Sequence, residues 1–361
     1  MISPILKYPG GKTRELPIIE KLMPKFNNYY EPFLGGGAVW LNTDSQKYFV
    51  NDISIDLMNL YHFIKEKDLK FKKIVCDIER FWNINNYENF IIDNAFLVKE
   101  KDIEKECFFI KKISSLAKNN AIGVENIDII FRNKLEESFY RCQKKFINMN
   151  SEKIDDIEGI MVTVVKNAIY LTLRDVYNLT SEKRLRTACY WFLREFAYSS
   201  MFRFNSKGDF NVPYGGKSYN NKSLLVKLNY AFSNEIQCKL RNTILSAVDF
   251  KEFMEIYKPT KNDFVFLDPP YDSEFSTYDQ NKFDREQQEL LAKYLTYELK
   301  ASFMLIIKET DFIKKLYPKG KKTKGGDGHI FVDCFDKQYQ VSFKNRNNRK
   351  TKHLIVTNYE F

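Results

Sequence analysis

The run from Phe264 to Tyr271 limits what this chain can fold into more than any other segment. Four apolar residues come directly before Asp268, and two prolines and a tyrosine follow it. A short apolar run that ends at a proline indicates a buried strand, because proline cannot donate to a β ladder and disfavours helix in the residue before it. The pattern predicts an α/β sheet with Asp268 at its carboxyl edge, where open α/β sheets bind ligands.

This string of an acid, two prolines and an aromatic residue suits the recognition of a nucleobase amine. The carboxylate of Asp268 and the carbonyl of Pro269 can accept hydrogens from an exocyclic amino group, and Pro270 stiffens the turn. Tyr271 can stack on a flat base. A ring-bound NH2 is a poor nucleophile since its lone pair is delocalised, and accepting its hydrogens localises that pair. The alternative is an ordinary exit from a strand into a turn.

The composition narrows the class of protein. Of the 361 residues, 44% are apolar, which is ample for the core of one large domain or two ordinary ones. No apolar run approaches the roughly 18 residues that a membrane span needs, and the start of the chain lacks a signal-peptide pattern. We therefore expect a cytoplasmic protein with no membrane segment.

Charge and metal-binding residue types add two further expectations. The chain carries 57 basic and 47 acidic residues, a formal net charge of +10, with a pI of about 9.0, which is compatible with a polyanion as partner. Six cysteines are scattered without a C-x-x-C pair, and only three histidines are present. This pattern indicates reduced thiols and predicts that the protein holds no metal.

Strand and helix signals alternate near both ends of the chain but not in its middle. The runs expected as strands are 29–33, 47–51, 264–267, 303–307, 340–343 and 354–359. Between them, lysine, glutamate, isoleucine and phenylalanine recur at helical spacing. We predict a discontinuous, Rossmann-like α/β domain of residues 1–62 and 236–361, interrupted by a mostly helical insert, residues 63–235, with a β-hairpin near 202–215.

A glycine turn after the first expected strand indicates a nucleoside site. Gly35, Gly36 and Gly37 stand where the backbone must pass close to such a ligand and side chains would obstruct it. Asp52 ends the next strand and is placed to accept hydrogen bonds from ribose hydroxyls. Glu31 is close in sequence and could face a positively charged ligand. A structural turn with a solvated aspartate is the alternative.

The segment 7–13 mimics the end of a phosphate-binding loop. Its Gly-Lys-Thr tail contains Lys12, but Leu6 stands where such a loop needs a glycine. No apolar strand precedes the segment either. We therefore do not expect a P-loop ATPase.

Taken in order, these segments resemble the DNA adenine N6-methyltransferase (Dam) family, D12 class. The matching runs are Lys7–Lys12, Glu31–Gly37, Asn51–Asp52, Arg203–Gly215 and Asp268–Tyr271. In that family the methyl-donor motifs come first, the target-recognition region follows, and the catalytic Asp-Pro-Pro-Tyr comes last. The resemblance covers residues 1–62 and 190–361. It implies a site-specific adenine methyltransferase with a Rossmann-like, S-adenosylmethionine-dependent sheet and an inserted target-recognition domain.

The resemblance implies S-adenosylmethionine as cofactor and no metal. The residues that would contact this cofactor are Tyr8, Lys12, Phe33, Gly35, Gly36, Gly37, Asp52, Asp249, Phe250 and Asp268. Residues 268–271 would hold the target adenine, with N6 donating to the carboxylate of Asp268 and the carbonyl of Pro269. Because the sulfonium methyl is already activated, alignment and charge stabilisation can supply much of the rate.

The resemblance also implies double-stranded DNA as partner, with GATC as the expected site. The residues that would contact DNA are Lys7, Tyr198, Ser199, Met201, Arg203, Asn205, Lys207 and Pro213. An arginine on a guanine edge discriminates by about 1–3 kcal/mol. Tyr198 matches an aromatic residue that enters the duplex, while Ser199 stands where the family usually has asparagine. Helical spacing of Tyr198 and Met201 is also compatible with core packing.

Further expectations concern the reaction and its partners. Base flipping should accompany catalysis, because N6 cannot enter a closed pocket while its base is stacked. The loop 320–328 and the basic stretch 344–352 are candidates to approach a phosphate backbone, and the alternative for both is a solvated loop. We expect a monomer in solution, and pairing with a cognate restriction endonuclease is left open.

Two other classes of function stay open on the sequence alone. One is a methyltransferase acting on protein glutamine, a group in which asparagine normally replaces the residue at Asp268 and a DNA-type hairpin is absent. The other is a catalytically inactive DNA-binding regulator with the same fold. Intact Asp268 and Lys12 argue against the loss of activity.

Overall fold

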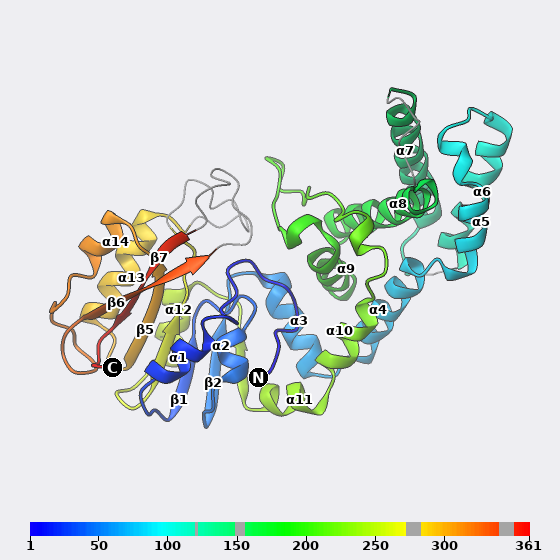
Figure 1. Cartoon of the computed structure of the whole chain (residues 1–361). Coiled ribbons are helices and arrows are strands. Elements are labelled where there is room, and N and C mark those ends of the chain that lie inside the picture. Colours follow the sequence, from blue (N-terminus) through cyan, green and yellow to red (C-terminus); the bar gives the residue numbers. More distant parts are fainter. Residues whose placement is uncertain (120–121, 149–155, 272–282, 339–349) are drawn as a thin grey trace. The chain divides into compact units, whose positions relative to one another are not determined.

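The computed structural model describes residues 1–119, 122–148, 156–271, 283–338 and 350–361. They form two compact units: unit 1 comprises residues 1–65 and 234–361, and unit 2 comprises residues 66–233 (Figure 1). None of the helices in these described ranges is long and apolar enough to cross a membrane.

Unit 1 is built around a seven-stranded sheet of order β3-β2-β1-β4-β5-β7-β6. The strands are β1 Asn28–Glu31, β2 Lys47–Asn51, β3 Thr243–Ser246, β4 Phe264–Leu267, β5 Ser302–Lys308, β6 Phe331–Gln338 and β7 Lys350–Thr357. Strands β1 to β5 run parallel, and β7 is antiparallel to both β5 and β6. The helices are α1 Leu16–Leu22, α2 Ala38–Asn42, α3 Ile55–Lys65, α11 Asn234–Arg241, α12 Phe250–Tyr257, α13 Arg285–Tyr297 and α14 Asp311–Leu316. The predicted α/β class is confirmed.

The order of the strands changes direction between β1 and β4. From β1 the chain continues outward to β2, and β3 follows on that side, whereas β4 and β5 lie on the other side of β1. The parallel register pairs Tyr29 with Phe264 and Tyr30 with Val265. Glu31 is the last residue of β1, and Asp268 directly follows β4, so both acids lie at the carboxyl ends of these two strands. Open α/β sheets bind ligands at such a switch point, so the fold places both acids where a site is expected.

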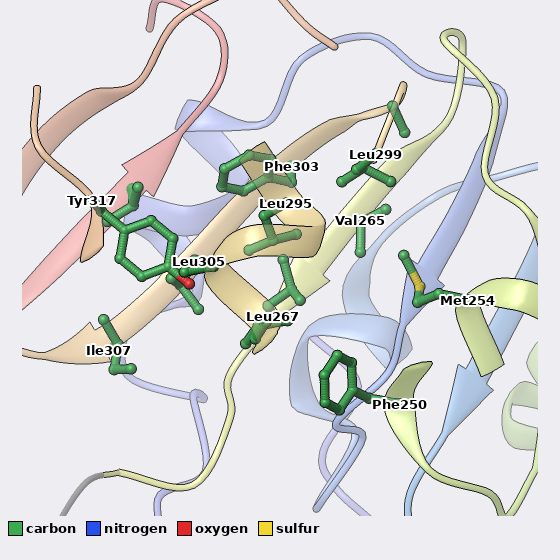
Figure 2. Packing of buried hydrophobic residues seen from close by; sticks show 14 of the residues in the cluster. Phe250, Met254, Val265, Leu267, Leu295, Leu299, Phe303, Leu305, Ile307 and Tyr317 are labelled. Carbon is green, nitrogen blue, oxygen red and sulfur yellow. The ribbon is translucent and has the colours of Figure 1, made fainter. Parts of the chain in front are cut away.

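Strand β4 is apolar on both faces because both faces are covered. All four of its side chains are buried, as is usual for parallel strands between helix layers. Alternate residues share one face, and Figure 2 shows Val265 and Leu267 beside Phe303 and Leu305 of β5, packed with side chains from α12 and α13. This core fixes the direction in which β4 delivers Asp268 to the sheet edge.

The antiparallel edge of the sheet differs from the prediction. The strand expected at 354–359 is observed as β7, which starts earlier, at residue 350, and the strand expected at 340–343 lies outside the described residues. Strand β6 was not predicted. It reads Phe-Val-Asp-Cys-Phe-Asp-Lys-Gln and forms the outer edge of the sheet, where a strand has one unpaired side and polar residues are favoured.

The loop 320–328 lies at the amino edge of the sheet, opposite Asp268. The backbone N–H of Lys324 donates to the Thr296 carbonyl at 3.0 Å, and the N–H of Asp327 donates to the Asn358 carbonyl at 2.7 Å. The side chain of Asn358 donates a hydrogen bond to the Ala301 carbonyl and accepts one from the Phe303 N–H, at the start of β5. The expected approach of this loop to a phosphate backbone stays a prediction. The basic stretch 344–352 lies almost wholly outside the described residues.

Unit 2 is mostly helical. Its α-helices are α4 Leu69–Trp82, α5 Glu88–Asp93, α6 Ile103–Asn119, α7 Ile127–Asn148, α8 Ile157–Leu179, α9 Lys183–Phe196 and α10 Leu224–Ala231, with short 3-10 turns η1 Asn85–Tyr87, η2 Ala95–Val98, η4 Tyr198–Ser200 and η5 Lys217–Tyr219. Helix α8 packs on α7 and α9, and α9 also packs on α4. Aromatic residues fill this interior, as where the rings of Trp82 and Phe196 lie 4.6 Å apart.

Where a hairpin was predicted, near 202–215, the described chain forms a bridged loop without continuous strands. Isolated antiparallel bridges pair Ala197 with Tyr214 and Phe204 with Phe210. The rings of Phe204 and Phe210 also lie 6.2 Å apart, edge to face. Backbone hydrogen bonds from Asn205 N–H to the Asp209 carbonyl and from Asn211 N–H to the Arg203 carbonyl, together with this ring contact, hold the two arms together.

The side chain of Asn51 ties together the segments that follow three neighbouring strands. It is buried, and its amide nitrogen donates to the carbonyls of Pro32 and Val248, each at 3.0 Å. Its oxygen accepts from the Val248 N–H at 3.0 Å. These bonds fix the loops after β1 and β3 relative to the end of β2, and buried amides of this kind are costly to leave unmatched.

Replacing Asn51 by leucine should destabilise the protein by about 3 kcal/mol, because two carbonyls and one N–H lose their partner in a buried position. Urea unfolding at equilibrium measures this loss. Asn242→Leu, at an exposed position just before β3, is the matched control and should change the unfolding free energy by less than about 0.5 kcal/mol. Equal effects of the two substitutions would contradict this role of Asn51.

Candidate active site

A lysine from the start of the chain is bound to the acid at the end of β4. The Lys12 side chain is only 3% exposed, and its ammonium pairs with Oδ2 of Asp268, whose side chain is 21% exposed. The same ammonium donates to the Tyr271 hydroxyl and to the Gly10 carbonyl, each at 3.2 Å. The Tyr271 hydroxyl also lies 3.4 Å from Oδ1 of Asp268. The structure thus brings together residues of two separate predicted motifs, Lys12 from segment 7–13 and Asp268 and Tyr271 from segment 268–271.

This arrangement leaves one oxygen of Asp268 more available than the other. Oδ2 faces the Lys12 ammonium, whereas the contact of Oδ1 with the Tyr271 hydroxyl is long. A carboxylate oxygen has two lone pairs. Oδ1 can therefore accept a hydrogen bond from a ligand, while the buried cation stabilises the negative charge.

Glu31, at the end of β1, is the second acid of this edge. It is buried, and its Oε2 accepts from the Tyr29 hydroxyl at 2.8 Å and from the Trp40 N–H at 3.1 Å. Burial raises the pKa of Glu31 to about 8; the bond from Tyr29 opposes this rise, and the negative charge of Asp268 adds to it. A positive charge close to a buried carboxyl lowers its pKa, so a cationic ligand would favour the ionised form of Glu31.

The glycine turn packs against an aromatic ring from the amino-terminal segment. A Cβ on Gly35 or on Gly36 would lie 3.1 Å from atoms of Tyr8. Gly35 also has a φ of +50°, in the left-handed region. Its N–H donates to Oδ2 of Asp52 at 2.8 Å, and the Ser54 N–H donates to Oδ1 at 3.0 Å. Tyr8, the turn and Asp52 therefore form one cluster beside Glu31.

Three phenylalanines form an aromatic cluster: Phe33 follows β1, Phe250 follows β3, and Phe283 precedes α13. The Phe33 ring centroid lies 5.6 Å from that of Phe250 and 5.2 Å from that of Phe283. Phe250 is buried and begins α12, while Phe33 is partly exposed. Asp249 caps α12 by accepting from the Lys251 N–H at 2.8 Å. The predicted residues Phe33, Asp249 and Phe250 thus lie on the same edge of the sheet as Asp268.

His353 is a neighbour of the site that the sequence did not reveal. It is buried near the start of β7, and its ring centroid lies 5.3 Å from that of Tyr271. The ring centroid of Phe335, in β6, lies 5.7 Å from that of His353. Because β7 is antiparallel, its first residues reach the edge where the parallel strands end. No local motif marks His353, so only the strand order could have identified it.

The predicted DNA-contacting residues of unit 2 lie on and around the bridged loop. Tyr198 is 50% exposed, so packing in the core is ruled out for it, and Met201 is partly buried. The Tyr198 N–H donates to the carbonyl of the exposed Pro213 at 2.9 Å. Ser199 has a left-handed φ of 53°, a conformation that asparagine and glycine adopt more easily than serine. Lys7 is exposed in unit 1.

The tip of the bridged loop carries two exposed basic side chains. Arg203 and Lys207 are both exposed, and Nε of Arg203 donates to the Asn211 side chain at 3.3 Å. Asn205 has a different task, since its side-chain oxygen accepts from the N–H groups of Lys207 and Asp209 at 2.9 Å each. Asn205 therefore closes the turn, and the two basic residues are the better candidates for a nucleic-acid contact.

No group of three or more histidine, cysteine, aspartate or glutamate side chains that could hold a metal ion occurs in the part of the chain that the structure describes.

The raised pKa of Glu31 predicts a pH dependence of stability. Its folded-state pKa of about 8 lies above the ordinary value of 4.5. The contribution of Glu31 to the unfolding free energy is therefore fully present below pH 4.5 and is lost as pH rises through 8. The difference in unfolding free energy between the native protein and Glu31→Gln should decrease as pH rises from 4.5 to 8, by at most about 1.4 kcal/mol for each pH unit.

Urea unfolding of both proteins between pH 5 and 8 measures this difference. Glu20→Gln, at an exposed position of α1, is the control and should leave the pH dependence of the unfolding free energy unchanged. A pH-independent difference between the native protein and Glu31→Gln would contradict the prediction.

One family model and several relatives match most of the chain. The model of the D12 class N6 adenine-specific DNA methyltransferases matches residues 8–145 and 133–325. The Type II methyltransferase M.CviBI of Paramecium bursaria Chlorella virus NC1A is 25% identical, with 99% of this chain and 100% of the relative covered. The Type II methyltransferase M.MjaIII of Methanocaldococcus jannaschii is 26% identical, with 88% of each covered. The Retron Ec67 DNA adenine methylase of Escherichia coli is 26% identical, with 88% of this chain and 81% of the relative covered.

Proposed function

The chain belongs to the D12 class of N6 adenine-specific DNA methyltransferases, and from this premise we propose that it transfers the methyl group of S-adenosylmethionine to N6 of a flipped adenine in duplex DNA. The family and the enzyme class predicted from the order of the motifs are confirmed. The observation that supports the finer proposal is the group of Asp268, Lys12 and Tyr271 at the carboxyl end of β4.

The cluster around the glycine turn fits S-adenosylmethionine, which supplies a methyl group already activated on a sulfonium. Asp52 accepts from the Gly35 and Ser54 N–H groups, and a carboxylate, with about four lone-pair sites, can also accept from ribose hydroxyls. Glu31 is a buried acid that a cationic ligand would ionise. Phe33 and Phe250 offer aromatic surface to an adenine ring, and Tyr8 bounds the turn. Lys12, which we expected to touch the cofactor, acts in this proposal through Asp268.

Asp268 and Pro269 would orient the amino group that receives the methyl. Oδ1 of Asp268 and the Pro269 carbonyl accept the two N6 hydrogens, which turns the nitrogen lone pair toward the donor. Lys12 holds Oδ2 and keeps the carboxylate in place, while Tyr271 stacks on the base. Alignment and charge stabilisation are the sources of rate. No strong base is required, because the N6 proton becomes acidic as the new bond forms.

We further propose that the bridged loop of unit 2 reads the sequence around the flipped adenine. Arg203 and Lys207 are exposed there, and Pro213 and Tyr198 lie beside them along the loop. Lys7 supplies another exposed cation in unit 1. The net charge of +10 favours a polyanion. GATC is the proposed target, and it rests on the resemblance of the motifs in the sequence. A monomeric state and a restriction partner stay predictions from the sequence.

Asp268→Asn should lower methyl transfer to DNA by at least about 100-fold, because the amide cannot replace the charged acceptor of the amino group. Transfer of labelled methyl groups to unmethylated duplex DNA measures this rate. Asp44→Asn, at an exposed position before β2, is the matched control and should keep the native rate. Full activity of Asp268→Asn, or label found on protein and not on DNA, would refute the proposal.

Arg203→Ala should relax the preference at one base pair of the target by a factor of about 5 to 150, the equivalent of 1–3 kcal/mol. Sequencing of methylated adenines in DNA treated with each protein gives the preferred site and its tolerance. Lys183→Ala, an exposed basic residue at the start of α9, is the control and should keep the native preference. An unchanged preference in Arg203→Ala would assign Arg203 to the phosphate backbone or to no contact.

A further inference from the structure

The backbone between Asp268 and Tyr271 has one torsion that its own sequence does not restrict. The rings of Pro269 and Pro270 fix two φ angles. Each residue before a proline is confined to extended ψ values, which restricts Asp268 and Pro269. Pro270 is followed by tyrosine, so neither rule applies to its ψ. This angle sets where the Cα of Tyr271 lies.

A buried glutamine of α13 donates a hydrogen bond to the Pro270 carbonyl, whose direction depends on this torsion. Gln288 is 0% exposed, and its Nε2 donates to the Pro270 carbonyl at 2.8 Å. The donor must be the nitrogen, because the amide oxygen cannot donate. Since the carbonyl direction is determined by ψ of Pro270, the bond fixes the remaining free angle before Tyr271.

Gln288 occupies a position where an apolar residue would pack at lower cost. Leu291 and Ala292, on the next turn of α13, are buried in the core. The Oε1 atom of Gln288 is buried and has no hydrogen-bond partner among the residues that the structure describes, and a buried polar atom without a partner opposes folding. Among the residues that the structure describes, the side chain makes one hydrogen bond, and it goes to the proposed catalytic turn.

We propose that Gln288 is a positioning residue of the methyl-transfer reaction, which orients Tyr271 through the Pro270 carbonyl. The inference rests on the proposed function, in which Tyr271 stacks on the flipped base. Two further contacts restrict the side chain of Tyr271: His353 lies against its ring, and Lys12 donates a hydrogen bond to its hydroxyl. These contacts act on the ring, whereas Gln288 acts on the backbone that carries it.

Gln288→Met separates positioning from folding, because methionine fills a similar volume without the donor group. The variant should stay folded with a thermal unfolding temperature close to the native value, since removal of a buried unmatched oxygen offsets the lost hydrogen bond to the Pro270 carbonyl. Its kcat for methyl transfer to unmethylated duplex DNA should fall about 10- to 100-fold, the size of effect that a small misplacement produces. The KM for S-adenosylmethionine should stay within about twofold, because the residue lies outside the cofactor cluster.

Gln288→Glu adds a pH signature that a purely structural role would not produce. A protonated glutamic acid can donate to the Pro270 carbonyl, whereas the carboxylate repels it, and burial raises the pKa of a glutamic acid. Activity relative to the native protein should therefore recover as pH falls from 8 to 6. Gln287→Glu, the neighbouring residue with a partly exposed side chain, is the matched control and should follow the native pH profile.

Two results would overturn the inference. The first is a kcat of Gln288→Met within twofold of the native value. The second is a parallel loss of stability and activity in both Gln288 variants with no recovery at low pH, which would reduce the residue to a structural one. Asp268→Ala, assayed alongside, separates this failure from that of the proposed function: if Asp268→Ala is inactive and Gln288→Met is fully active, only the role of Gln288 is wrong.

Discussion

The parallel pairing of β1 with β4 is the constraint on which the rest of unit 1 depends. It joins Tyr29 and Tyr30 to Phe264 and Val265, residues separated by the whole of unit 2 in the sequence. Because the strands are parallel and in this register, both deliver their following residues to one edge of the sheet. The acids, the glycine turn and the proline turn meet there as a result, and the amino-terminal segment adds Lys12 and Tyr8 to the same edge.

Charge gives this edge its chemical character. Unit 1 keeps the Lys12 cation, the Glu31 acid and the partly exposed Asp268 close to one another. Removing one member of a buried charged group leaves the others without compensation, so the cluster is costly to hold and easy to disturb. Its value is that the acceptor oxygens are already oriented before any substrate arrives, which lowers the reorganisation required during reaction.

Local patterns predicted the parts of this protein that local chemistry determines. The apolar run before Asp268 identified β4, the glycines identified the turn after β1, and the order of the motifs identified the family. The contact between Lys12 and Asp268 spans 256 positions, and no window of sequence contains it. His353 and the edge strand β6 were not predicted for the same reason. Antiparallel pairing at the end of the sheet, and not residue type, brings them to their places.

The interruption of the sheet by unit 2 has a consequence for synthesis on the ribosome. Strands β1 and β2 emerge early, yet β4, the partner on the other side of β1, follows only after all of residues 66–233. During that interval β1 offers an unpaired edge of N–H and carbonyl groups, which other chains can join. The time taken to translate the helical insert is therefore time in which this edge of the nascent chain is open to pairing with other chains.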